Sequence, residues 1–147
     1  MKRKVAEKWV AALLSGNYKQ IKGQLADVSP ALKKKGVFLG DVDPKTEKLT
    51  KPYGFCCLGV LCEVYNKSST GKKDPVTLAA FNDGHLPEKV ASWAGMRTSE
   101  GLYKNGVRGT KKNPEGCFEY NLANLNDLSK KGFKYIAGVI QKHVKDL

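Results

Sequence analysis

Four cysteines, Cys56, Cys57, Cys62 and Cys117, are the residues with the widest range of chemistry in this sequence. Thiolates are natural zinc ligands, but structural zinc sites pair their cysteines two to four residues apart at loop turns. Three of the four cysteines lie instead in one continuous apolar run, and no second pair follows. Free cysteines in such a run behave as small buried hydrophobic residues. The pattern predicts core thiols and no metal site.

The sequence also matches other known catalytic arrangements poorly. A thiol nucleophile beside His85 or His143 needs exposure and a low pKa, whereas an apolar run hides a thiol and raises its pKa. Residues 101–106 have the glycine spacing of a phosphate-binding loop, but Val107-Arg108 follows where Lys-Ser or Lys-Thr is required. The 14 carboxylates form no paired cluster. We therefore expect a binding protein that is not an enzyme and has no cofactor.

Binding of an anionic nucleotide requires cations for its phosphates and aromatic faces for its bases. Such side chains occur near the ends of expected helices and at turns, outside the apolar runs. Tyr18 and Trp93 are expected to stack on bases, and Gln20 to contact a base edge. Lysine and arginine side chains at 22, 97 and 108 are expected to hold phosphates. The candidate ligand-binding residues are Tyr18, Gln20, Lys22, Trp93, Arg97, Arg108, Asn126 and Asp127.

Each candidate also has a structural alternative. A tyrosine or tryptophan near a helix end more often belongs to the core. The pair Asn126-Asp127 suits a turn or a helix cap equally well, because these side chains accept hydrogen bonds from nearby backbone N–H groups. The sequence leaves both interpretations open.

The net charge of +12 favours an acidic partner such as a nucleotide, a nucleic acid or a membrane surface. Only three of the 26 basic residues are arginines, namely Arg3, Arg97 and Arg108. Proteins dedicated to nucleic-acid recognition favour arginine for its bidentate geometry. Two interpretations of the lysines remain open: a binding face, or a solubilising composition.

Helical periodicity and helix-end residues predict three helices. Residues 3–15 form an amphipathic pattern that ends at Gly16, and residues 133–144 form another. Residues 86–93 have a proline near the first helical position and an acid in the first turn. Residues 55–65 are too long and too uniformly apolar for a typical strand, so they are predicted as a fourth, buried central helix.

Short strands are predicted at 37–39, 76–81 and 117–120. Asn105-Gly106 favours a type I′ turn, which predicts a hairpin with its turn at these two residues. Residues 66–75 are expected to form a flexible loop. These elements indicate an α+β fold, dominated by helices, in a single compact domain of residues 1–147.

The chain contains no apolar stretch of the length that crosses a membrane. The basic start at residues 1–4 is followed by polar interruptions, so no signal peptide is expected. The cysteines are therefore expected to be thiols in a reducing compartment.

The order of the motifs resembles a widespread family of small bacteriophage proteins. The match covers nearly the whole chain, and its most specific part is Phe-Cys-Cys-Leu-Gly-Val-Leu-Cys. The motifs are Trp9, Ser15-Gly16-Asn17-Tyr18-Lys19-Gln20, Gly54 to Cys62, Leu86-Pro87 to Trp93-Ala94-Gly95, Leu125-Asn126-Asp127 and Phe133 to Ile140. Gly132-Phe133-Lys134-Tyr135 departs from the family's acid-rich start of this last helix.

Proteins of this kind look similar to phage anti-defence sponges, which are oligomers that sequester the cyclic nucleotide signals of bacterial CBASS immunity. The resemblance implies a cyclic dinucleotide or related ligand, a homo-oligomer and a location in the cytoplasm of the infected bacterium. Three alternatives stay open: a phage nucleic-acid-binding regulator, a protein inhibitor of a host enzyme, and a nuclease or phosphodiesterase with an unfamiliar site.

Overall fold

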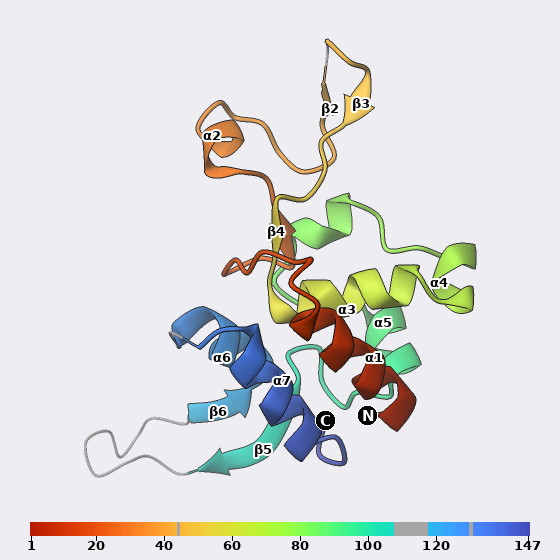
Figure 1. Cartoon of the computed structure of the whole chain (residues 1–147), viewed down its shortest axis with the longest axis vertical. Helices are drawn as coiled ribbons and strands as arrows, with labels where there is room; N and C mark the ends of the chain where they lie inside the picture. The colour runs from red at the N-terminus through yellow and green to blue at the C-terminus, as the bar shows by residue number, and fades with distance from the viewer. Residues whose placement is uncertain (44, 108–117, 130) are drawn as a thin grey trace.

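The computed structural model describes residues 1–43, 45–107, 118–129 and 131–147 (Figure 1). Helices dominate, and the strands are short antiparallel pairs, which confirms the predicted α+β class. In chain order the elements are α1 (Arg3–Leu14), β1 (Ala26–Asp27), α2 (Pro30–Lys33), β2 (Val42–Asp43), β3 (Lys48–Leu49), β4 (Gly54–Phe55), α3 (Cys57–Asn66), α4 (Ser69–Lys73), the 3-10 helix η1 (Ala79–Asn82), α5 (Glu88–Ala94), β5 (Leu102–Val107), β6 (Phe118–Asn121), α6 (Leu122–Leu128) and α7 (Phe133–Lys142).

Helix α3 is the buried centre of the structure, as its apolar sequence predicted. It begins after Cys56, whose Sγ accepts a hydrogen bond from the backbone N–H of Gly59 at 3.4 Å. Its side chains are buried from Cys57 to Cys62, and α1, α4, α5 and α6 pack around it. The indole N–H of Trp9 donates to the backbone carbonyl of Cys57 at 2.9 Å, which joins α1 to α3. In the described part of the chain, no helix has both the length and the apolar character needed to cross a bilayer.

Helices α1 and α7 lie side by side and bring the two chain termini together (Figure 1). The N-terminal ammonium of Met1 donates to the carbonyl of Val144 at 3.1 Å. The backbone N–H of Arg97 donates to the carbonyl of Leu147 at 2.8 Å. Both helices occur where the periodicity predicted them, because each has one continuous apolar face for the core.

The three strand pairs have different positions. Pair β1–β4 lies against the core beside α3, whereas β5–β6 lies beside α7 (Figure 1). Pair β2–β3 belongs to an extension, residues 28–43 and 45–53, which leads away from the body of the structure (Figure 1). This extension carries exposed apolar side chains, including Phe38, which is 59% exposed, and Val42 and Leu49.

Three local predictions are wrong. Residues 37–39 are not a strand, because their backbone bonds locally instead of to another strand of the described structure: the N–H of Val37 donates to the carbonyl of Leu32 at 3.1 Å, and the carbonyl of Phe38 accepts from the N–H of Asp41 at 3.2 Å. Residues 76–81 are not a strand either: they lead into η1, which buries Phe81, so their apolar character reflects burial. Residues 66–75, predicted as a loop, contain α4, which Ser68 caps by accepting a hydrogen bond from the N–H of Gly71 at 3.0 Å.

The predicted hairpin exists in a different form. Strand β5 continues through Asn105-Gly106 and pairs antiparallel with β6, so the turn is not at these residues. The register shifts between Lys104 and Val107, and the Asn-Gly pair lies within this irregularity. The local turn preference is therefore accommodated as a bulge inside the strand. The prediction of a strand over 117–120 is confirmed at 118–120, and Cys117 lies outside the described residues.

The packing of α3 against the backbone of Leu25, the residue before β1, leads to a test at Gly59. A Cβ at this position would lie 1.7 Å from the carbonyl oxygen of Leu25, which belongs to rigid backbone. We expect Gly59→Ala to lower the free energy of unfolding by about 3 kcal/mol, because backbone must move. The control is Gly138→Ala on α7, where a Cβ meets nothing within 4 Å and where alanine favours the helix by up to about 1 kcal/mol. Urea denaturation measures both, and a wild-type value for Gly59→Ala would contradict this packing.

Candidate functional site

The structure distributes the predicted ligand-binding residues over three places. Tyr18 borders a groove between α1 and α3. Gln20, Lys22, Asn126 and Asp127 meet where the segment after α1 contacts α6. Trp93 and Arg97 lie at the end of α5 and just after it. Arg108 lies outside the described residues.

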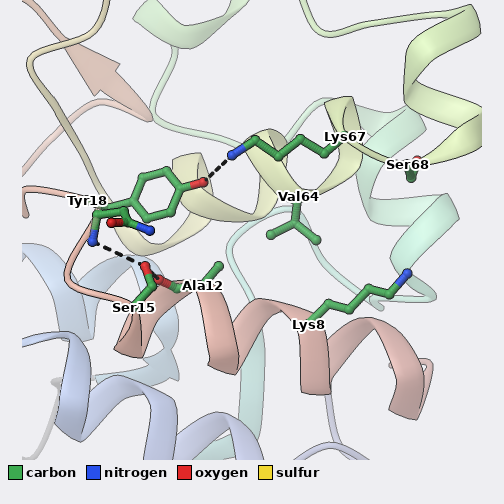
Figure 2. Close-up of a pocket in the computed structure, with 8 residues that line it drawn as sticks. Lys8, Ala12, Ser15, Tyr18, Val64, Lys67 and Ser68 are labelled. Atoms are coloured by element: carbon green, nitrogen blue, oxygen red, sulfur yellow. Dashed lines mark hydrogen bonds between the residues drawn. The ribbon is translucent and has the colours of Figure 1, made fainter.

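The groove beside Tyr18 has a volume of about 320 Å³ and opens between α1 and the C-terminal half of α3 (Figure 2). Its lining combines apolar, hydroxyl and cationic side chains, and among the described residues it contains no carboxylate side chain. The lining residues are Lys8, Ala12, Ser15, Asn17, Tyr18, Val64, Lys67 and Ser68.

Local sequence signals build the Tyr18 end of this groove. Helix α1 ends at Leu14, and Gly16 adopts a positive φ of 75° that turns the chain. The Ser15 hydroxyl accepts a hydrogen bond from the N–H of Asn17 at 3.2 Å. The Tyr18 ring then packs edge-on against Phe55, with centroids 5.3 Å apart. The position of the aromatic ring is therefore held by backbone and by the core.

Lys67 reaches across the groove to Tyr18 (Figure 2). Its ammonium donates a hydrogen bond to the Tyr18 hydroxyl at 2.9 Å. This hydrogen bond is the main cause that raises the pKa of Lys67, so the lysine keeps its charge at neutral pH. Glu63, one turn earlier on α3, does not line the groove, and burial raises the pKa of its carboxyl. With Lys8 on the α1 wall, the groove presents two cations and a fixed aromatic ring.

Asn126 joins three parts of the structure and is fully buried. Its Oδ1 accepts hydrogen bonds from the side-chain amide of Gln20 at 3.0 Å and the backbone N–H of Cys57 at 3.2 Å. Its amide donates to the carbonyl of Ile21 at 2.8 Å and to the Asp127 carboxylate at 2.7 Å. These bonds use both donors and both acceptor positions of the amide. Asn126, near the end of α6, therefore holds the segment after α1 against the start of α3.

Gln20 and Lys22 reinforce the same junction. The amide of Gln20 also donates to the carbonyl of Lys131 at 3.2 Å, and the ammonium of Lys22 donates to the carbonyl of Ser129 at 3.2 Å. Lys22 is exposed. In this structure both side chains fix the loop that presents Tyr18.

Trp93 and Arg97 are separate from the groove, since neither lines it. The Trp93 ring packs edge-on against Tyr65, with centroids 5.3 Å apart. The guanidinium of Arg97 donates to the carbonyl of Lys145 at 3.5 Å, so this residue contacts the C-terminal segment through both its side chain and its backbone. Gly95 follows α5 with a positive φ of 67° and supports the predicted helix end.

The cysteines Cys56, Cys57 and Cys62 are buried free thiols, as predicted. Burial raises the pKa of Cys56 to about 11, and burial also raises the pKa of the other two thiols. A thiolate nucleophile at neutral pH is therefore disfavoured at these positions. Among the residues that the structure describes, no three His, Cys, Asp or Glu side chains gather as metal ligands would.

Sequence analysis missed Lys8, Lys67 and Ser68 as groove residues. Lys67 directly follows the buried helix, and Lys8 lies on the polar side of an amphipathic helix, so each resembled an ordinary surface lysine. Their shared position depends on the packing of α1 on α3, which residue spacing does not encode.

Comparison with protein families and known proteins gives one informative result. Residues 1–45 and 31–144 match the model of a family described as Domain of unknown function (DUF8296). The two matched segments overlap and together cover nearly the whole chain. No curated protein and no solved structure matches.

The junction at Asn126 can be tested by substitution. Asn126→Ala leaves the N–H of Cys57 and the carbonyl of Ile21 without this partner in a buried site. We expect the free energy of unfolding to fall by about 2 to 4 kcal/mol, since each unsatisfied buried group costs about 1–3 kcal/mol. Asn124→Ala, at an exposed position on the same helix, should stay within about 0.5 kcal/mol of wild type. Equal unfolding curves for the two variants would show that the junction contributes nothing to stability.

Proposed function

Because the chain belongs to the family described as Domain of unknown function (DUF8296), a description that names no activity, we propose its function from its own residues. The protein binds cyclic oligonucleotide immune signals and sequesters them without cleavage. It acts as a bacteriophage anti-defence protein against CBASS-type immunity in the cytoplasm of the infected bacterium. The phage and CBASS parts of this proposal rest on the motif resemblance.

The observation that carries the binding proposal is the Lys67–Tyr18 pair at the edge of a cationic groove, in which no described lining residue is a carboxylate. A phosphate entering the groove would find the ammonium groups of Lys8 and Lys67 and the hydroxyl groups of Ser15 and Ser68. The face of Tyr18 would take one base, because the edge contact with Phe55 leaves the ring in a fixed orientation.

Sequestration needs affinity and no chemical step. A nanomolar dissociation constant corresponds to about −12 kcal/mol, and each base stacked on an aromatic ring contributes about 1–3 kcal/mol. Two lysines and one tyrosine per groove are a modest set of contacts. The proposal therefore includes a homo-oligomer, in which a second chain adds further contacts to the ligand.

The exposed apolar side chains of the extension support self-association, since burying them against another chain would remove apolar surface from water. We expect a homo-oligomer of closed symmetry, because such arrangements dominate among soluble assemblies. Light scattering at micromolar concentration, with and without a cyclic dinucleotide, measures the mass. A monomer under both conditions would contradict the oligomeric part of the proposal.

The ligand is tested by incubating the protein with a panel of cyclic mono-, di- and trinucleotides and releasing bound material by heat. Recovery of an intact cyclic nucleotide supports sequestration. Recovery of linear nucleotides would show that the protein is an enzyme. If no nucleotide is recovered with the protein, the binding proposal is wrong. Binding of long duplex DNA that weakens steeply with salt would favour the nucleic-acid regulator instead.

The groove is tested by substitution with the ligand that the panel identifies. Lys67→Ala and Tyr18→Ala should each weaken binding about tenfold or more and reduce the ligand-induced rise in Tm. Tyr18→Phe retains the ring and should retain more affinity than Tyr18→Ala. Lys73→Ala on α4 removes the same charge away from the groove and should bind as wild type. Equal losses of ligand affinity for Lys67→Ala and Lys73→Ala would show that binding depends on net charge and not on the groove.

A further inference from the structure

A second cleft lies between the β5–β6 pair and α7 and has a volume of about 850 Å³. It shares no lining residue with the groove beside Tyr18. Its size falls within the range of about 300–1,000 Å³ that is usual for ligand sites. Its described aromatic and cationic lining residues are Tyr103, Tyr120, Lys134, Tyr135, Lys142 and His143.

The cleft is built from aromatic rings on three elements. Tyr103 on β5 lies 6.1 Å from Tyr120 on β6 and 5.1 Å from the ring of His143 after α7, measured between ring centroids. Tyr135, in the first turns of α7, is 50% exposed. Large aromatic rings left partly exposed around one cleft are the usual surface on which planar groups stack.

Cations flank these rings. Lys134 and Lys142 both line the cleft from α7, and the lining residues that the structure describes include no carboxylate. The ammonium of Lys131 lies 4.9 Å from the centroid of the Tyr135 ring, which adds positive charge at the same end. Nδ1 of His143 lies 3.0 Å from the carboxylate of Asp146, which orients the imidazole.

The spacing of the lysines indicates the length of the ligand. Lys134 and Lys142 are eight residues apart on one helix, which corresponds to about 12 Å along its axis. This separation exceeds that of neighbouring phosphates on one nucleic-acid strand. A ligand that contacts both lysines while stacking on tyrosines of the same cleft needs more than one nucleotide.

We propose that this cleft binds a short single-stranded oligonucleotide, with bases stacked on Tyr135 and the neighbouring tyrosines and phosphates held by Lys134 and Lys142. Stacking and backbone charge recognise single strands with little dependence on sequence, since every base has an aromatic face. The inference does not depend on the proposed function of the groove, because it rests on different residues and a different ligand.

The test is calorimetric titration of the full chain with a short oligothymidylate at low salt. Tyr135→Ala and Lys142→Gln should each weaken binding about tenfold. Tyr135→Phe retains the ring and should bind as wild type. Lys145→Gln removes a charge just after α7 from a residue that does not line the cleft, and it should also bind as wild type. Because Tyr135 and Lys142 are exposed, thermal melts of these variants should match wild type.

Several results would overturn the inference. One is the absence of oligothymidylate binding by wild type, including the case in which an acidic tyrosine-containing peptide binds there instead. Another is wild-type affinity in both Tyr135→Ala and Lys142→Gln. Lys67→Ala separates the two sites: it should leave oligothymidylate binding intact, whereas loss of binding in this variant alone would assign the oligonucleotide to the groove.

Discussion

The close contact between helix α3 and the backbone of Leu25, the residue before β1, is the constraint on which the rest of the structure depends. The carbonyl of Leu25 accepts a hydrogen bond from the N–H of Cys56 at 3.0 Å, and Gly59 lies against the same carbonyl with no room for a Cβ. This contact fixes the position of a helix that is buried on nearly all sides. Trp9 and Asn126 then attach α1 and α6 to its first turn through Cys57.

Both proposed ligand-binding surfaces depend on this arrangement. Lys67 comes directly after the last turn of α3, and the packing of α1 brings Tyr18 within hydrogen-bonding distance of it. Helix α7 packs on the other side of α1 and contributes Tyr135, Lys134 and Lys142 to the second cleft. Tyrosine and lysine side chains outside the core therefore gather at two separate places around these helices, the groove beside Tyr18 and the cleft beside α7.

The eight predicted binding residues show how local chemistry and tertiary position differ. An aromatic ring after a helix end makes Tyr18 a predicted binding residue, and Tyr18 does border a groove. Asn126 was equally compatible with a structural role, and its amide forms four hydrogen bonds within the protein. Trp93 and Arg97 had suitable chemistry as well, yet they contact Tyr65 and the C-terminal segment. The type of a side chain indicates what it can bind, while its neighbours determine what it contacts.

The sequence by itself determined the α+β class, the helices α1, α3, α5 and α7, and the burial of three thiols, because each depends on periodicity or composition within one segment. Tertiary structure alone decided that residues 76–81 enter a 3-10 helix and that β5 continues through Asn105-Gly106, since partners elsewhere in the chain outweighed local preference. It also decided that Lys67 meets Tyr18 and that three tyrosines from separate elements line one cleft. These residues lie far apart along the chain, and only the packing of the helices around α3 brings them together.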